Sequence, residues 1–95
     1  MSTRDERIAA KLAETFAPLE CQLINESHLH AGHAGARSGA GHYRLRIVSS
    51  RFEGQGRLGR HRLVYDCLHD MMHTEIHALT IDALAPSEVS AGVSK

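Results

Sequence analysis

The chain begins with apolar residues spaced four positions apart, which are Ile8, Leu12 and Phe16. This spacing places them on one face of the chain and predicts an amphipathic helix. Thr3 and Glu6 have the spacing of a capping box at the start of this helix. Pro18 ends the helix, because proline cannot continue it.

Two segments in which apolar and polar residues alternate follow the helix. Residues 19–25 carry their apolar side chains at odd positions, which predicts a half-buried strand. The segment "HYRLRIVS" predicts a second strand with Tyr43, Leu45 and Ile47 on its apolar face. The connection between them ends at Gly41 and is longer than the usual hairpin loop of about 2 to 5 residues. Loops of that length are commonly functional or mobile.

Helical spacing of apolar residues returns over residues 60–73 and predicts a second main helix. The segment "IHALTIDAL" then predicts a third strand, and residues 86–95 predict a polar, flexible tail. The order of elements predicts an α+β domain over residues 1–85, with helices over one face of a three-stranded sheet.

Composition sets limits on this domain. A chain of 95 residues is long enough for one modest core. The formal net charge is zero, but residues 37–62 contain seven arginines and a single acidic residue, Glu53. This basic band permits an acidic or phosphate-bearing partner without requiring one.

The two cysteines, Cys21 and Cys67, lack the close spacing of a metal site and fall at apolar positions of their elements. They are therefore expected to be buried free thiols. The N-terminal segment is charged and has no continuous apolar stretch, so it resembles neither a signal peptide nor a membrane span. These features favour the cytoplasm.

Three histidines, His28, His30 and His33, lie among small residues in the segment "NESHLHAGHAG". This pattern is compatible with a functional metal site, with adventitious binding of zinc or nickel, or with a loop that has no such role. For His77, at the start of the third predicted strand, a structural hydrogen bond is the commoner role. Surface or structural roles are also expected for His42, His69 and His73.

Four basic residues gather at the start of the second predicted helix, and these are Arg57, Arg60, His61 and Arg62. A helix N-terminus with basic residues suits phosphate, and arginine reads guanine edges in DNA. A solvated helix face, or docking to an acidic protein surface, is favoured over sequence-specific DNA contact, because the net charge is zero and Asp66 and Asp70 follow on the same helix. The sequence contains no recognisable nucleophile or acid–base constellation and no P-loop, which argues against an enzyme.

Four blocks along the chain resemble the BolA family: "NESHLHAGHAG", "HYRLRIVSSRFEG", "RHRLVYDCL" and "IHALTIDALAP". The resemblance implies an αββαβ domain of the class II KH type, with a three-stranded mixed sheet covered by helices on one face. It also implies that the GxxG loop of true KH domains is missing. Family members work with monothiol glutaredoxins in iron–sulfur cluster trafficking, and some are DNA-binding transcriptional regulators.

The resemblance further implies a 2Fe–2S cluster shared with the glutaredoxin. His30 and His77 are the implied ligands from this chain, with His33 as a substitute for His30. A glutaredoxin cysteine and a glutathione thiol would supply the other two ligands. The chain alone is then expected to be a monomer without cofactor or membrane contact, and a heterodimer with its partner. A DNA-binding regulator is the alternative.

Overall fold

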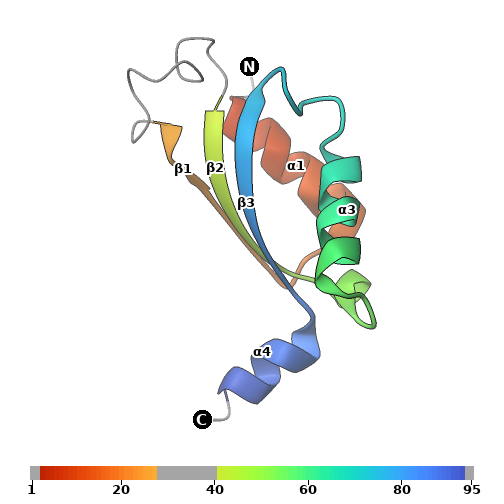
Figure 1. Cartoon of the computed structure of the whole chain (residues 1–95). Coiled ribbons are helices and arrows are strands. Elements are labelled where there is room, and N and C mark those ends of the chain that lie inside the picture. Colours follow the sequence, from red (N-terminus) through yellow and green to blue (C-terminus); the bar gives the residue numbers. More distant parts are fainter. Residues whose placement is uncertain (1–2, 28–40, 94–95) are drawn as a thin grey trace.

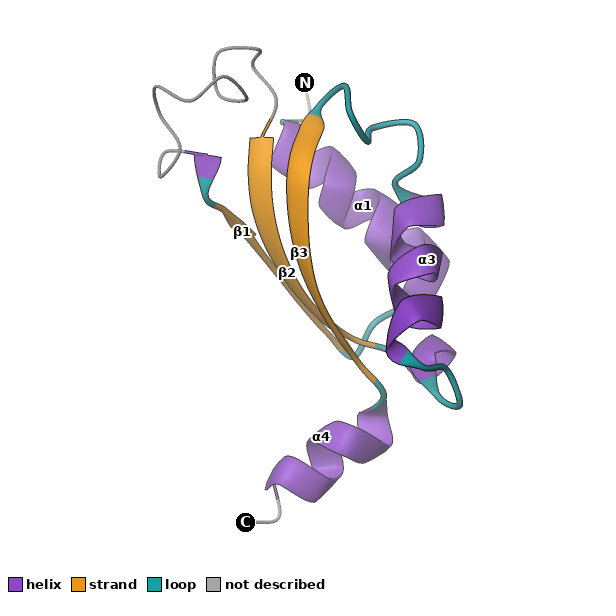
Figure 2. Cartoon of the chain, in the orientation of Figure 1, coloured by secondary structure: helices purple, strands orange, loops and turns teal. Residues whose placement is uncertain are grey.

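The computed structural model describes residues 3–27 and 41–93. The elements, in chain order, are α1 (Arg4–Phe16), β1 (Glu20–Asn25), β2 (Gly41–Val48), the 3-10 helix η2 (Ser50–Phe52), α3 (Arg57–Cys67), β3 (Ile76–Leu84) and α4 (Pro86–Val93). Figures 1 and 2 show α1 and α3 on one side of the sheet, while α4 extends from the end of β3. The predicted α+β fold is confirmed.

Helix α1 forms where the apolar spacing predicted it. Thr3 Oγ1 accepts a hydrogen bond from the Glu6 backbone N–H, and the Glu6 side chain accepts one from the Thr3 backbone N–H. The bonds to Thr3 lower the pKa of Glu6. This capping box satisfies two amide groups that the first turn of a helix leaves without partners. Ala17 ends the helix in the left-handed region, one residue before Pro18.

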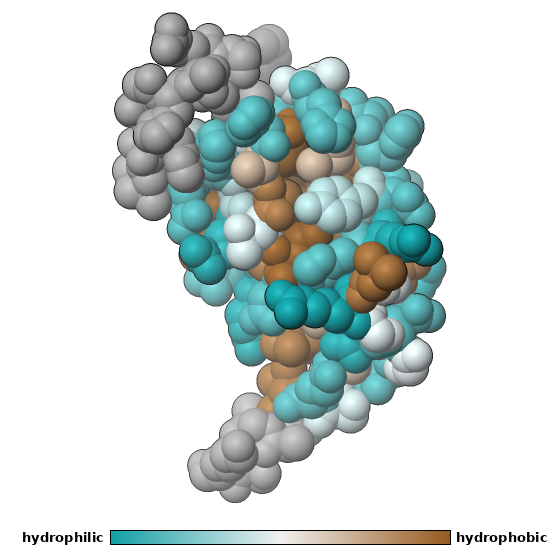
Figure 3. All heavy atoms as spheres, in the orientation of Figure 1, coloured by the Kyte–Doolittle hydropathy of each residue, from teal (hydrophilic) through white to brown (hydrophobic). Residues whose placement is uncertain are grey.

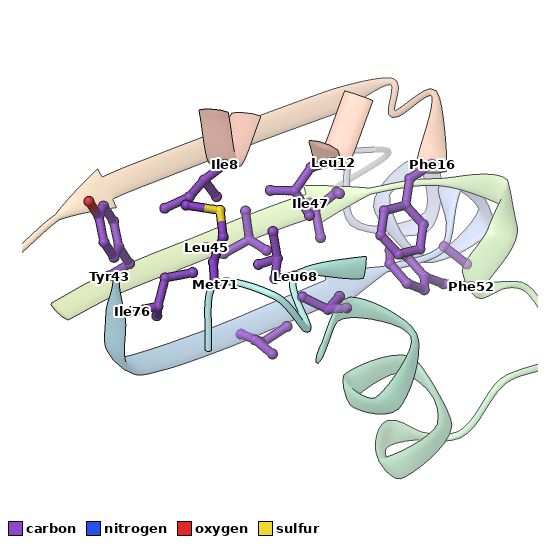
Figure 4. Close-up of a cluster of buried hydrophobic side chains, with 13 residues drawn as sticks. Ile8, Leu12, Phe16, Tyr43, Leu45, Ile47, Phe52, Leu68, Met71 and Ile76 are labelled. Atoms are coloured by element: carbon purple, nitrogen blue, oxygen red, sulfur yellow. The ribbon is translucent and has the colours of Figure 1, made fainter. Parts of the chain in front are cut away.

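The sheet has the strand order β1-β2-β3, with β1 antiparallel and β3 parallel to the central β2. In the register, Leu45 of β2 lies opposite Leu23 of β1 and Ile81 of β3. Figure 4 shows the core between this face of the sheet and the helices. The core cluster consists of Ile8, Leu12, Phe16, Tyr43, Leu45, Ile47, Phe52, Val64, Leu68, Met71, Ile76, Ile81 and Ala85.

Strand β1 departs from the expected burial. Cys21 is exposed and Leu19, just before the strand, is 76% exposed, whereas Leu23 is half-buried. The prediction that Cys21 is buried is therefore wrong. Since β1 is an edge strand, its side chains have a neighbouring strand on one side only. Cys67 is partly rather than fully buried, so that prediction is also too strong.

Helix α3 is shorter than the predicted helix over residues 60–73, because it runs from Arg57 to Cys67. Its last turn closes at Leu68, whose N–H donates to the carbonyl of Val64. The chain then turns through His73, which has a φ of 68°. Met71 lies in this turn and is still buried in the core, so its apolar spacing extended the predicted helix too far.

The sequence left open whether a helix forms after the third strand. The structure contains one, α4, within the segment expected to be a polar, flexible tail. Glu88 accepts a hydrogen bond from the Ala85 N–H at 2.7 Å, which satisfies an amide at the helix start. Regular structure therefore extends eight residues beyond the predicted tail boundary at Pro86.

The start of α3 contains GxxG spacing that the sequence analysis did not single out, in Gly56, Arg57, Leu58 and Gly59. These residues do not form a loop. Gly56 is the N-cap of α3, and the other three residues begin the helix. In KH domains the GxxG loop clamps nucleic acid backbone, so this position bears on the DNA-binding alternative.

Candidate functional site

His77 is the second residue of β3, and it is exposed. Its neighbour Ile76 is fully buried and pairs with Gly41 of β2. The next pair in the register is His42 with Ala78, so His77 lies at an irregularity of the strand pairing and is held between two paired residues, while its side chain is exposed. The ring centroid of His77 lies 5.0 Å from that of His42 on β2. The structure thus pairs the predicted ligand with a histidine to which the sequence assigned no functional role.

A groove of about 620 Å³ opens beside His77. Its wall on β3 is made by His77, Ala78 and Leu79, and its wall on α3 and the following turn is made by Tyr65, Asp66, His69, Met72 and His73. His69 and His73, expected to be ordinary surface residues, therefore border the same groove as His77. Among the described residues, no group of three or more histidine, cysteine or acidic side chains is arranged to hold a metal ion.

The segment between β1 and β2 starts and ends close to this histidine pair. The Glu26 N–H donates to the carbonyl of His42 at 2.7 Å, and the His42 N–H donates to Ser27 Oγ at 3.1 Å. The Gly41 N–H donates to the carbonyl of Glu75, immediately before β3. His28, His30 and His33 lie outside the described residues, so their assignment as ligands stays a prediction.

A polar network fixes this end of the sheet to the start of α1. The Tyr43 hydroxyl donates to Asp5 Oδ1 at 2.6 Å and accepts from Arg4 Nε at 2.7 Å. Asn25, the last residue of β1, also donates to Asp5. Burial and the bond to Asp5 raise the pKa of Tyr43. On the other side, Arg7 of α1 pairs with Glu75 ahead of β3. These contacts with α1 fix the end of the sheet that carries His42 and His77.

Three of the four predicted basic residues share a second groove, of about 390 Å³, at the start of α3. Arg57, Arg60 and His61 line it, and Arg62 does not. Arg60 is held by the protein itself, because Nη1 donates to the carbonyl of Ala83 at 2.9 Å and to Glu88 Oε1 at 2.6 Å. Arg57 and Arg62 are exposed and better placed for an external partner.

The cysteines have other surroundings. Cys67 Sγ donates to Thr15 Oγ1 at 3.2 Å and lies 3.3 Å from the carbonyl oxygen of Lys11. Partial burial raises the pKa of the Cys21 thiol, although the residue as a whole is exposed. A raised pKa disfavours the thiolate, which is the form that binds metals.

Sequence reasoning missed the role of Glu88 and the proximity of His42 to His77. The first required knowledge of α4, whose sequence is small and weakly patterned. For the second, the signal was present: His42 and His77 both fall at the start of their predicted strands. Only the order and register of the strands would have placed them side by side.

The fold and the histidine-lined groove define a small α+β domain. The family model described as BolA-like protein matches residues 12–88. The chain belongs to this family.

Relatives and solved structures agree with this assignment. SufE-like protein 1, chloroplastic/mitochondrial, from Arabidopsis thaliana is 43% identical over 94 residues, which span 94% of this chain and 25% of that relative. DNA-binding transcriptional regulator BolA from Escherichia coli (strain K12) is 38% identical over 76 residues, 80% of this chain and 70% of the relative. The structure of the BolA domain of SufE1 from Arabidopsis thaliana matches with a TM-score of 0.81 and 41% identity, covering 93% of this chain and 98% of that chain. Within the described residues, no helix has the length and apolar character needed to cross a membrane.

Proposed function

We propose that this protein is an adaptor in iron–sulfur cluster trafficking, which shares a 2Fe–2S cluster with a monothiol glutaredoxin. His77 is the fixed ligand from this chain and His30 is the second, with His33 as its substitute. One observation carries the proposal. An exposed histidine, fixed by the sheet and open to a groove, lies next to the point where both ends of the His30 segment leave the sheet.

The residues fit this cargo chemically. A 2Fe–2S cluster takes four protein or thiol ligands, and neutral imidazole is a good ligand for iron. Two histidines on one iron raise the reduction potential relative to an all-cysteine cluster. The glutaredoxin cysteine and a glutathione thiol would complete the set. Because this chain supplies only part of the ligand set, the cluster would be held between two proteins and could be passed on.

The distances permitted by the chain support the pairing of His30 with His77. Ser27 is hydrogen-bonded to His42, and His42 is in ring contact with His77. A chain of three residues spans at most about 11 Å, so His30 lies within reach of this edge. Fixing such a segment costs about 1 to 2 kcal/mol per residue. The ligand already fixed in β3 avoids that cost.

The test mixes the protein with a monothiol glutaredoxin that carries a 2Fe–2S cluster with glutathione. Visible absorption and circular dichroism are recorded as the ratio of the proteins increases. We expect the cluster spectrum to change and the change to be complete at a 1:1 ratio. A cluster spectrum that stays identical at all ratios would contradict the adaptor function.

A DNA-binding regulator in the cytoplasm is the second candidate. It is supported by the relative named as a DNA-binding transcriptional regulator and by the GxxG spacing of residues 56–59. Exposed Arg57 lies within that sequence and beside the groove at the start of α3. The adaptor is favoured, because Arg60 is bonded to Ala83 and Glu88 rather than available to phosphate. An unchanged cluster spectrum would leave the regulator as the better explanation.

A further inference from the structure

Helix α3 exposes two large apolar side chains, Leu58 at 66% and Tyr65 at 38%. They are seven residues apart, which is close to two helical turns, so they lie on the same side of the helix. Arg62 lies between them on that side and is also exposed. We call Leu58, Arg62 and Tyr65 the α3 stripe.

The domain's own packing does not use the α3 stripe. The opposite side of the helix supplies the core, where Val64 is fully buried. Leu63 and Cys67 pack against that core as well. In Figure 3, an apolar protrusion over α3 stands between strongly hydrophilic side chains. Single exposed apolar residues are ordinary, but tyrosine and arginine are enriched among the residues that carry most of the binding energy in protein interfaces, and here they lie beside an exposed leucine.

The α3 stripe is continuous with the groove that contains His77. Tyr65 belongs to both, because it also lines that groove together with His69 and His77. A protein that covers the stripe would therefore reach the edge at which the cluster is proposed to bind.

Charge indicates the chemistry of the partner. Arg57 and Arg62 are exposed beside Leu58 at the N-terminal end of α3. The acidic residues occur further along, and of these Asp70 is already paired with Lys11. The end of the stripe around Leu58 is therefore basic and complements an acidic surface that surrounds an apolar patch.

We propose that the glutaredoxin partner docks on the α3 stripe, with an apolar patch against Leu58 and Tyr65 and acidic groups opposite Arg62. This inference rests on the proposed function, since it assigns the docking surface of the same partner. It adds apolar anchors that are distinct from the cluster ligands. Docking would then persist when no cluster is present.

Calorimetric titration of the cluster-free protein with a cluster-free monothiol glutaredoxin tests this surface. Leu58→Ala and Tyr65→Ala should each raise the Kd about tenfold or more, as expected when a buried contact of an interface is removed. Arg62→Glu should weaken it as well, and this variant leaves the apolar residues in place. Leu19→Ala and Ile24→Ala are matched controls, because those residues are 76% and 40% exposed and lie just before or on β1, the edge strand that β2 separates from β3. The controls should bind like the wild type.

The outcomes separate the two proposals. If the wild type binds and the α3 stripe variants bind equally well, the docking surface is wrong while the adaptor function stands. If the cluster-free wild type does not bind while the cluster spectrum still changes on mixing, the docking surface fails and the adaptor function stands. If there is neither binding nor a change of the cluster spectrum, both proposals fail. Circular dichroism of each variant checks that the fold is intact before the affinities are compared.

Discussion

At the scale of single residues, the two cysteines differ from the expectation drawn from their positions. Both fall at apolar positions, but Cys21 lies on an edge strand and is exposed. Cys67 faces α1, where its thiol donates to the Thr15 hydroxyl. A serine hydroxyl can make the same kind of bond. Replacing either cysteine by serine therefore exchanges a weakly polar thiol for a more polar hydroxyl at a position that is only partly shielded from solvent.

We expect Cys21→Ser to change the free energy of unfolding by less than about 0.5 kcal/mol, as at most surface positions. Cys67→Ser should cost about 1 to 2 kcal/mol, because its hydroxyl is partly buried and its bonds to α1 would be imperfect. Urea denaturation measures both values. Neither variant should alter the cluster spectrum of the glutaredoxin complex. A folded variant that loses this spectrum would show that a cysteine, rather than a histidine, binds the cluster.

At the scale of elements, an ion pair and several hydrogen bonds connect the first turn of α4 to the rest of the domain. Arg60 of α3 donates to Glu88 of α4 and to the carbonyl of Ala83 at the end of β3. Ser87 also donates to Glu53, beyond η2. The bonds from Arg60 and from the Ala85 N–H lower the pKa of Glu88. The start of the helix after β3 is therefore held by polar contacts, to Arg60 of α3 and to Glu53.

The lowered pKa gives α4 a pH dependence with a definite sign. The stabilisation that the ionised Glu88 carboxylate gives to α4 is fully present above the ordinary glutamate pKa of about 4.3. It is lost as the pH falls through the lowered pKa of Glu88. The helical Cα chemical shifts of α4 should therefore decrease in strongly acidic solution. Glu88→Gln should decrease them already at pH 7, whereas the control Glu14→Gln on α1 should not. Helical shifts in α4 that are equal in Glu88→Gln and the wild type would contradict this role of the ion pair.

At the scale of the whole molecule, the sequence predicts the elements better than their ends and contacts. Ile8, Leu12 and Phe16 predicted α1 correctly, because a buried helical face requires that spacing. Met71 extended the predicted α3 too far, because a buried residue in a turn has the same apolar character as one in a helix. The groove around His77 was not predictable, because it combines β3 with α3 and the turn after it. The same holds for Arg60, whose bonds to β3 and α4 are formed only in the folded domain.

We propose that His77 is the ligand that β3 holds in position for a shared 2Fe–2S cluster. The most direct measurement is the visible circular dichroism of the glutaredoxin complex formed with His77→Ala, compared with His30→Ala and the wild type. We predict that His77→Ala abolishes the histidine-type spectrum, because the variant removes the imidazole that β3 positions before any cluster binds. His30→Ala should only weaken it, since His28 or His33 can take the vacant position. An intact spectrum with His77→Ala, together with its loss when His28, His30 and His33 are all replaced, would contradict the two-histidine account.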